Sequence, residues 1–334
     1  MSIFYTRKEI ATRISILYSG NILASSFAGL IALGVFKLDG ARGLSGWRWL
    51  FIIQGVATFV IAVAACFVLP DEPMTTWWLN QEERQMAYDR VARDTVGHSA
   101  DVSLFAGLKE AVCDPKVWVF VYMQHLHIAT NGFKNFMPTI VDTLGFSMST
   151  TLILTCPPYL IAGILSICWA TSSGHFNERT WHITIAKGVA IFGFVLGCVT
   201  INIGARYFAM CVFTIGTYGV NSIILGWVSA SCGQTREKKA AALAIANVSA
   251  TLSLIWTPVC STGSSLTYYH SYPADYAQYI WPEWSEPRFV FPLSMSAGMA
   301  LACAAGAWLM RWMLIQENRK IRFSEPETTI FYAY

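Results

Sequence analysis

The chain has 334 residues, of which 54% are hydrophobic and only 13% are charged, and its formal net charge is +3. A soluble domain carries about 25% charged residues, so this chain lacks the polar surface that water requires, and lipid is expected to cover much of it. The small net charge gives no support for nucleic-acid binding. Composition therefore predicts an all-α, polytopic transmembrane helix bundle.

Apolar segments follow one another along nearly the whole chain. A helix needs about 20 mostly apolar residues to cross a bilayer, and about eight segments meet this requirement. They are Ile14–Phe36, Trp49–Leu69, Val117–Val141, Thr150–Thr171, Ile183–Ile203, Tyr207–Ala230, Ala240–Thr262 and Phe289–Met313. The third is the most polar, because it contains Lys134 and several amides.

Lys and Arg near the ends of the spans predict the orientation in the membrane. They are dense before the first span, around Arg179 and Arg236, and after the last span, whereas Gly145–Ser149 has none. The loop Lys37–Arg48 runs against this trend. Both termini and the Pro70–Lys116 loop are predicted to be cytoplasmic. In that loop Asn80–Arg93 is predicted to form a polar helix outside the membrane, and Ser324–Tyr334 is predicted to be a disordered tail.

Nine cysteines are scattered singly, with no CxxC pair. His125 and His127 are two residues apart, so on a regular helix they point to different faces and cannot bind one metal ion. The sequence therefore predicts no metal and no cofactor.

Short motifs occur in a recognisable order along most of the chain. They are GWRWLFIIQG (Gly46–Gly55), LPDEP (Leu69–Pro73), LNQEER (Leu79–Arg84), DPKVW (Asp114–Trp118), GHFNERTWH (Gly174–His182), KKAAALAIAN (Lys238–Asn247) and YIWPEWSEPRF (Tyr279–Phe289). Together they resemble the fungal anion:cation symporters of the major facilitator superfamily, the group that contains allantoate and nicotinate permeases.

The resemblance implies a major facilitator bundle with about eight of twelve helices present and the first four absent. It divides the chain into the last two helices of the N-terminal bundle (1–69), a central cytoplasmic loop (70–116), a six-helix C-terminal bundle (117–313) and a cytoplasmic tail (314–334). It also implies that Val117–Val141 and Tyr207–Ala230 line the substrate cavity.

The first of these helices carries a polar stripe. Gln124, Asn131 and Asn135 lie at spacings of seven and four, hence on one helix face, with Lys134 beside Asn131. A lysine near the bilayer centre costs several kcal/mol unless it faces water or a partner. Lys134 is therefore predicted to face the cavity and attract an anionic substrate. The alternatives are a lysine that snorkels to the interface and amides that join helices.

In the second of these helices Tyr218, Asn221 and Ser222 present polar groups to one side, which would grip a carboxylate or an aromatic ring or would join helices. The predicted spans contain no Asp or Glu, so His125 and His127 are the proton-coupling candidates, with a packing role as the alternative for each. By the resemblance, Asn177, Glu178 and Arg179 form a gating latch; the alternative is a solvated turn.

These features predict secondary active transport of a small organic anion or vitamin-like carboxylate of the allantoate and nicotinate class, coupled to protons. The predicted partners are that anion, protons and the lipid bilayer, and the protein is predicted to be a monomer in the plasma membrane. Two alternatives remain: a transporter-derived membrane sensor, or an inactive truncated product, that binds but does not translocate. An enzyme is disfavoured, because no HExxH, GxSxG or P-loop motif occurs.

Overall fold

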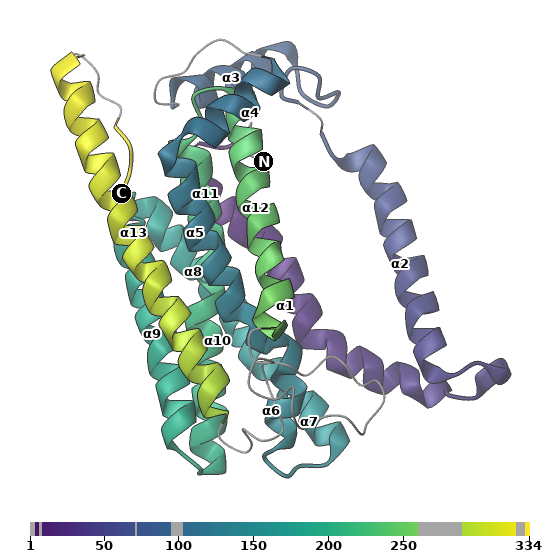
Figure 1. Cartoon of the computed structure of the whole chain (residues 1–334). Helices are drawn as coiled ribbons and strands as arrows, with labels where there is room; N and C mark the ends of the chain where they lie inside the picture. Colours follow the sequence, from purple (N-terminus) through teal and green to yellow (C-terminus); the bar gives the residue numbers. More distant parts are fainter. Residues whose placement is uncertain (1–3, 7–8, 71, 95–102, 260–288, 325–330) are drawn as a thin grey trace.

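The structure is a computed structural model that describes the chain except residues 1–3, 7–8, 71, 95–102, 260–288 and 325–330. Every regular element among the described residues is helical (Figure 1). This confirms the predicted all-α class. The helices are α1 (Ile10–Val35), η1 (Phe36–Leu38), η2 (Ala41–Gly43), α2 (Gly46–Val68), α3 (Gln81–Arg93), α4 (Leu104–Cys113), α5 (Pro115–Thr130), η3 (Asn131–Phe136), α6 (Met137–Asp142), α7 (Met148–Leu154), α8 (Cys156–Phe176), α9 (Thr180–Val199), α10 (Ile203–Tyr218), α11 (Asn221–Ser231), α12 (Arg236–Val259) and α13 (Val290–Ser324).

Seven segments among the described residues are long and apolar enough to cross a membrane. They are Ile10–Leu38, Gly46–Val68, Ser149–Phe176, Thr180–Val199, Ile203–Ser231, Arg236–Ile255 and Val290–Ser324. Each corresponds to one predicted span. The remaining prediction, Val117–Val141, does not appear as one helix, because it is divided into α5, η3 and α6.

Three of the predicted spans are interrupted, each at a sequence feature that weakens an α-helix. The first break is the 3-10 stretch η3, which contains Gly132. The second lies at Gly219 and Val220, between α10 and α11. The third lies at Thr155, just before Pro157 and Pro158, which occupy the first positions of α8 because proline lacks the N–H that an interior position would use. Breaks of this kind free main-chain groups inside a bundle.

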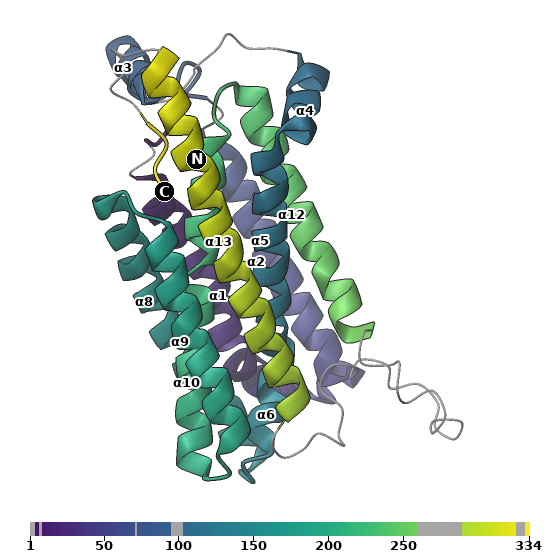
Figure 2. The same cartoon turned by 60° about the vertical axis from the view of Figure 1, so that its left-hand side comes forward.

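The helices from α5 to α13 form the packed part of the molecule, and α1 lies against it (Figures 1 and 2). The Ser26 hydroxyl in α1 donates to the Cys156 main-chain oxygen at the start of α8. Helices α9 and α10 come together where a side chain on Gly216 would collide with Ala186 and Ala190. Small residues let helices approach in membranes, where dispersion contacts take over from the hydrophobic effect.

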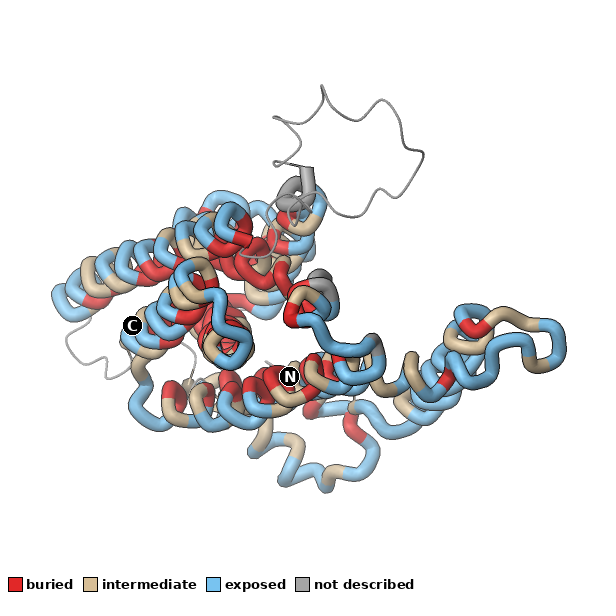
Figure 3. The backbone as a smooth tube through the Cα atoms, turned by 90° about the horizontal axis from the view of Figure 1, so that it is seen from below, coloured by how far each residue is buried: buried red, intermediate tan, exposed pale blue. Residues whose placement is uncertain are grey.

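Helix α2 stands apart from this bundle (Figure 1). Gly46 is its only buried residue. Seen from below in Figure 3, buried residues gather along the inward sides of the packed helices, while the arm formed by η1, η2 and α2 is mostly exposed. Lipid is the expected neighbour of its apolar side chains.

One end of the bundle holds the N-terminus, α3, α4, the start of α12 and the last turns of α13 (upper end in Figure 1). We call it the basic end, because Arg236, Lys238 and Lys239 lie there. The predicted helix Asn80–Arg93 is confirmed as α3: Asn80 and Glu83 form a reciprocal capping box. Helix α4 in the same loop was not predicted.

The prediction of a disordered tail is wrong for Phe331–Tyr334. These four residues return to the bundle, and Tyr332 is only 6% exposed. Asn318 in α13 binds the Tyr332 main chain twice, with Nδ2 donating to the oxygen and Oδ1 accepting from the N–H, both at 2.9 Å. A short aromatic tail segment can therefore be ordered by partners that lie elsewhere in the chain.

Candidate functional site

An amide pair connects the two helices that were predicted to line the cavity. Gln124 Nε2 in α5 donates to Asn221 Oδ1 at the start of α11 over 2.8 Å. Gln124 is 1% exposed, and its Oε1 has no hydrogen-bond partner among the described residues. Asn221 directly follows the break at Gly219 and Val220. The structure thus brings two predicted site residues into direct contact.

A second polar group lies in the bundle interior between α5 and α9. The His127 ring is 3.0 Å from the Lys187 amine at Nδ1 and 3.2 Å from the Asn131 amide nitrogen at Nε2. His127 and Lys187 are both fully buried. Asn131 Oδ1 has no hydrogen-bond partner among the described residues. An amine, an imidazole and an amide therefore form a row that is closed to solvent.

This row can hold its protons in two ways. If Asn131 donates to Nε2, the neutral His127 carries its proton on Nδ1 and Lys187 must accept as a neutral amine. If the Asn131 amide turns over, Oδ1 accepts from Nε2–H and Nδ1 accepts from a Lys187 ammonium. The two arrangements differ by one proton and by one amide rotation, so the row can store a proton without a carboxylate.

Lys187 was missed at the level of sequence, although a signal for it was present. It lies in the predicted span Ile183–Ile203, where an unpartnered lysine costs several kcal/mol. Lys187 belongs to neither of the two helices that the family resemblance assigns to the cavity. The signal is the lysine itself, because a charged residue within an apolar span marks a buried partner or a functional site.

Lys134 lies in η3 and is partly exposed. Its main-chain oxygen accepts from the Tyr159 hydroxyl at 3.4 Å. The Tyr159 ring meets the Tyr218 ring edge to face, with centroids 5.8 Å apart. Among the described residues the Lys134 ammonium has neither a hydrogen-bond nor an ion-pair partner. Tyr218 is therefore connected to Lys134 through Tyr159. The sequence had instead placed Tyr218 beside Asn221, on one side of one helix.

The two histidines point away from each other, as their spacing predicts. His125 Nδ1 lies 2.7 Å from the Ser249 main-chain oxygen in α12, whereas His127 faces α9. His125 therefore contributes to helix packing in this structure. The Asn135 side chain lies outside the described set, so the predicted stripe can be followed only through Gln124 and Asn131.

The predicted latch residues lie at the basic end and bind neighbouring helices. Glu178 Oε1 forms a 2.8 Å ion pair with Arg311 of α13. Arg179 is fully buried and donates from Nη1 to the Ser173 hydroxyl over 2.9 Å. Asn177 ends α8 in the left-handed conformation, at φ 52°, which asparagine tolerates better than most residues. Asn177 is exposed, Glu178 is half-buried and Arg179 is buried, so the three residues differ in their contact with the bundle.

A polytopic bundle whose interrupted helices hold polar side chains in its interior has the architecture of a helical membrane transport protein. Residues 2–258 match the Major Facilitator Superfamily. The chain belongs to this family, and it is a multi-pass integral membrane protein and not an enzyme.

Several fungal proteins are similar to the chain. The major facilitator-type transporter hxnP of Emericella nidulans is 34% identical over 233 residues, which cover 68% of this chain and 46% of that protein. An uncharacterised transporter of Schizosaccharomyces pombe is 30% identical over 76% of this chain and 52% of its own length. The MFS-type transporter efuF of Hormonema carpetanum is 32% identical, over 68% and 47%. The chain spans about half the length of the curated relatives it matches.

Proposed function

We propose that the protein takes part in secondary active transport of a small organic anion, coupled to protons. The observation that carries this proposal is the Lys134 ammonium, which lies in a helix break and has no protein anion beside it among the described residues. A cation in the membrane is expensive unless something compensates it. An anionic substrate would supply the missing charge.

The charges around this position support an anion over a cation. Two basic side chains lie in the segments that enclose the polar row: Lys134 in η3 and Lys187 within the Thr180–Val199 span. Acidic residues such as Glu317, Asp39 and Asp142 lie near the ends of the described helical segments, and the Thr180–Val199 span that holds Lys187 contains no Asp or Glu. Like charges focused in a low-dielectric interior attract the opposite charge. A carboxylate is the natural ligand for this field, with the Tyr159 and Tyr218 rings providing an aromatic wall.

We assign the proton-coupling role to His127 rather than to His125. His127 lies in the row with Lys187 and Asn131, whose two protonation arrangements differ by one proton. His125 is held against α12 instead. An anion arriving near Lys134 would favour an additional positive charge on the row, so substrate and proton would bind cooperatively.

The finer features of the proposal come from sequence motifs. The basic end would face the cytoplasm by the positive-inside trend, in the plasma membrane, with Glu178 and Arg311 as a latch there. The motifs Gly46–Gly55 and Leu69–Pro73 support the allantoate and nicotinate class of substrates. The second candidate function is a sensor that binds the anion without moving it.

Ligand binding tests this proposal directly. The chain is reconstituted into nanodiscs, and binding of radiolabelled nicotinate and allantoate is measured. We expect Lys134→Ala to weaken binding by about tenfold or more and Lys134→Arg to retain it, because one charge contact in a low dielectric contributes more than 1 kcal/mol. The control is Lys37→Ala, since Lys37 is exposed in η1. Unchanged binding in Lys134→Ala contradicts the proposal.

Reconstitution into liposomes then separates the transporter from the sensor. Accumulation driven by an inward proton gradient and abolished in His127→Leu supports coupled transport. Binding that depends on Lys134, without accumulation under any gradient, supports the sensor.

A further inference from the structure

The segment Phe331–Tyr334, which we call the strap, contacts four separate parts of the basic end. Besides the two hydrogen bonds from Asn318 of α13, the Trp227 ring nitrogen in α11 donates to the Ala333 oxygen at 2.9 Å. Gln234, after α11, donates to the Tyr332 hydroxyl at 2.8 Å. The Arg179 main-chain N–H, just before α9, donates to the Tyr334 oxygen at 3.5 Å.

After α13, the α11 region and the start of α9, the fourth part of the basic end that the strap contacts is α5. The Lys116 ammonium lies over the Tyr332 ring, 4.9 Å from its centroid. Such a cation–π contact strengthens when water is excluded, and the Lys116 side chain is only 8% exposed. The Arg311 guanidinium lies in the same way over the Tyr334 ring, at 4.8 Å.

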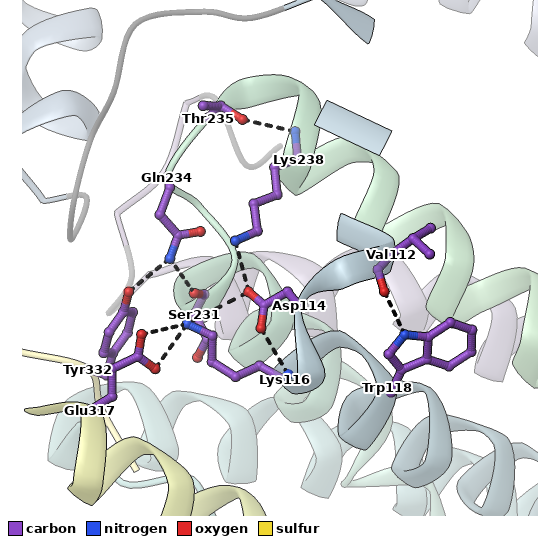
Figure 4. A network of polar contacts seen from close by, with 10 residues as sticks. All are labelled: Val112, Asp114, Lys116, Trp118, Ser231, Gln234, Thr235, Lys238, Glu317 and Tyr332. Carbon is purple, nitrogen blue, oxygen red and sulfur yellow. Dashed lines mark hydrogen bonds and ion pairs between the residues drawn. The ribbon is translucent and has the colours of Figure 1, made fainter. Parts of the chain in front are cut away.

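Beneath Tyr332 lies a network of charges, which Figure 4 shows from close by; Lys116, Asp114 and Lys238 are largely buried in it, and Glu317 is partly exposed. Lys116 pairs with Glu317 of α13 at 2.9 Å, and Lys238 of α12 pairs with Asp114 at 2.8 Å. Lys116 is also 3.8 Å from Asp114. Buried ion pairs hold helices together only while water stays out. The Tyr332 ring covers Lys116 and so shields one edge of the network.

The strap therefore joins α5 and α11, the helices of the Gln124–Asn221 pair, to α13 at one end of the bundle. We propose that the strap is a lock: when docked it fastens the basic end of the bundle closed, and its release lets water into the network and loosens the ends of α5 and α11. The lock goes beyond the proposed transport function and is tested without it.

Cys232 is a built-in reporter of this state. It directly follows α11, outside the membrane spans, and is fully buried. It packs in the same apolar cluster as Tyr332. Burial, reinforced by the nearby Asp114 carboxylate, raises the pKa of the Cys232 thiol to about 12. Opening the basic end would expose this thiol and restore its reactivity, because the thiolate is the nucleophile.

The experiment uses the full chain with Cys232 as the sole cysteine, in nanodiscs, and measures the rate of labelling by a hydrophilic maleimide. We expect labelling on the order of tenfold faster, or more, in Tyr332→Ala and in a variant that lacks residues 331–334, because several hydrogen bonds no longer oppose local opening. Tyr332→Phe keeps the ring over Lys116 and should stay close to the unmodified strap. Phe331→Ala is the matched control, since Phe331 contacts Arg322 at the far end of α13.

A second reporter, with Cys303 as the sole cysteine, keeps the result decisive. Cys303 is fully buried in α13 beside the Met123 main chain, deep in the bundle. Faster labelling of Cys232 alone supports the lock. Unchanged Cys232 labelling in both strap variants overturns it. An equal rise at Cys303 overturns it as well, because the strap would then maintain the whole bundle and not its basic end.

Discussion

Helix α2 and the span formed by α10 and α11 show how two membrane segments can differ although both cross the bilayer. The window of α2 has a mean hydropathy of 2.4, and none of it is buried. The Ile203–Ser231 span has a mean hydropathy of 1.6, and 67% of its window is buried. The more apolar helix faces outward, because lipid tails solvate apolar side chains as well as protein does.

The same difference explains where the polar residues lie. A helix that faces lipid is mostly apolar, because lipid tails satisfy no polar group, and Gln54 is the one amide side chain of α2. A helix inside the bundle can carry Tyr218 and Asn221, since Tyr159 and Gln124 meet them. High hydropathy therefore marks the outer surface of this protein, and moderate hydropathy marks its interior.

The largest difference in stability between the bundle and α2 should come from placing a large side chain at Gly216, where α9 and α10 are in close contact. A leucine there would place its Cβ 2.6 Å from the Ala186 oxygen, and overpacking of this kind costs about 3 kcal/mol. Gly216→Leu should unfold well below the unmodified protein in a thermal scan in nanodiscs. Gly55→Leu in α2, where a Cβ meets nothing within 4 Å, should change stability by less than about 0.5 kcal/mol. Equal effects would remove the distinction between the two regions.

The next effect concerns the buried pair of His127 and Lys187. His127→Leu leaves the Lys187 amine buried without its partner, which should cost about 2–3 kcal/mol. The double variant with Lys187→Met should recover much of this loss, because both polar groups are then gone. Chemical unfolding in nanodiscs measures both. Gln54→Leu in α2 is the control and should be near neutral. If the double variant is less stable than His127→Leu, Lys187 has another essential partner.

A smaller effect is expected for the Glu178–Arg311 ion pair. The two side chains are 24% and 22% exposed, so Glu178→Gln should cost about 1 kcal/mol, less at high salt. Glu9→Gln removes the corresponding pair at the start of α1, Glu9–Arg90, which is 3.3 Å long and 41% and 49% exposed. That variant should match the unmodified protein. Unfolding at low and high salt compares them, and a larger loss in Glu9→Gln would reverse the expected order.

The smallest effect should come from the ion pair that joins the exposed arm to the bundle. In this pair Glu72, which follows α2, meets Arg236 at the start of α12. The hydrogen bond from Arg236 lowers the pKa of Glu72 below its ordinary value of 4.5. Stability from this pair is therefore present above pH 4.5 and is lost as the pH falls through the folded-state pKa. Thermal scans of Glu72→Gln should show a small deficit at neutral pH that disappears in acid. A deficit that grows in acid would contradict this sign.

Much of the fold could be predicted from sequence. Span existence depends on apolar length, which is why seven of the predicted spans reappear. Helix α3 was predicted from the polar stretch Asn80–Arg93, and its local capping box of Asn80 and Glu83 shows that neighbouring residues suffice to start it. The predicted span Val117–Val141 did not reappear as one helix, because the break at η3 depends on neighbours as well as on Gly132.

The candidate site could be predicted only in part. Gln124, His127 and Asn131 were found because polar residues in a span are conspicuous. Lys187 was not found, and the pairing of Gln124 with Asn221 was not predicted although both residues were: Lys187 lies 60 positions from His127, and Asn221 lies 97 positions from Gln124. The strap was assigned to a disordered tail because its four residues have no local reason to be ordered.

The sequence by itself determined that this protein is a helical membrane protein, and by its motifs pointed to the major facilitator family. These properties follow from the length and polarity of segments, which each segment expresses alone. Only the tertiary structure decided which polar groups meet: Lys187 with His127, Tyr218 with Tyr159, and Tyr332 with Lys116. Such contacts depend on how whole helices are rotated and packed. That rotation and packing are determined jointly by side chains that lie far apart in the chain.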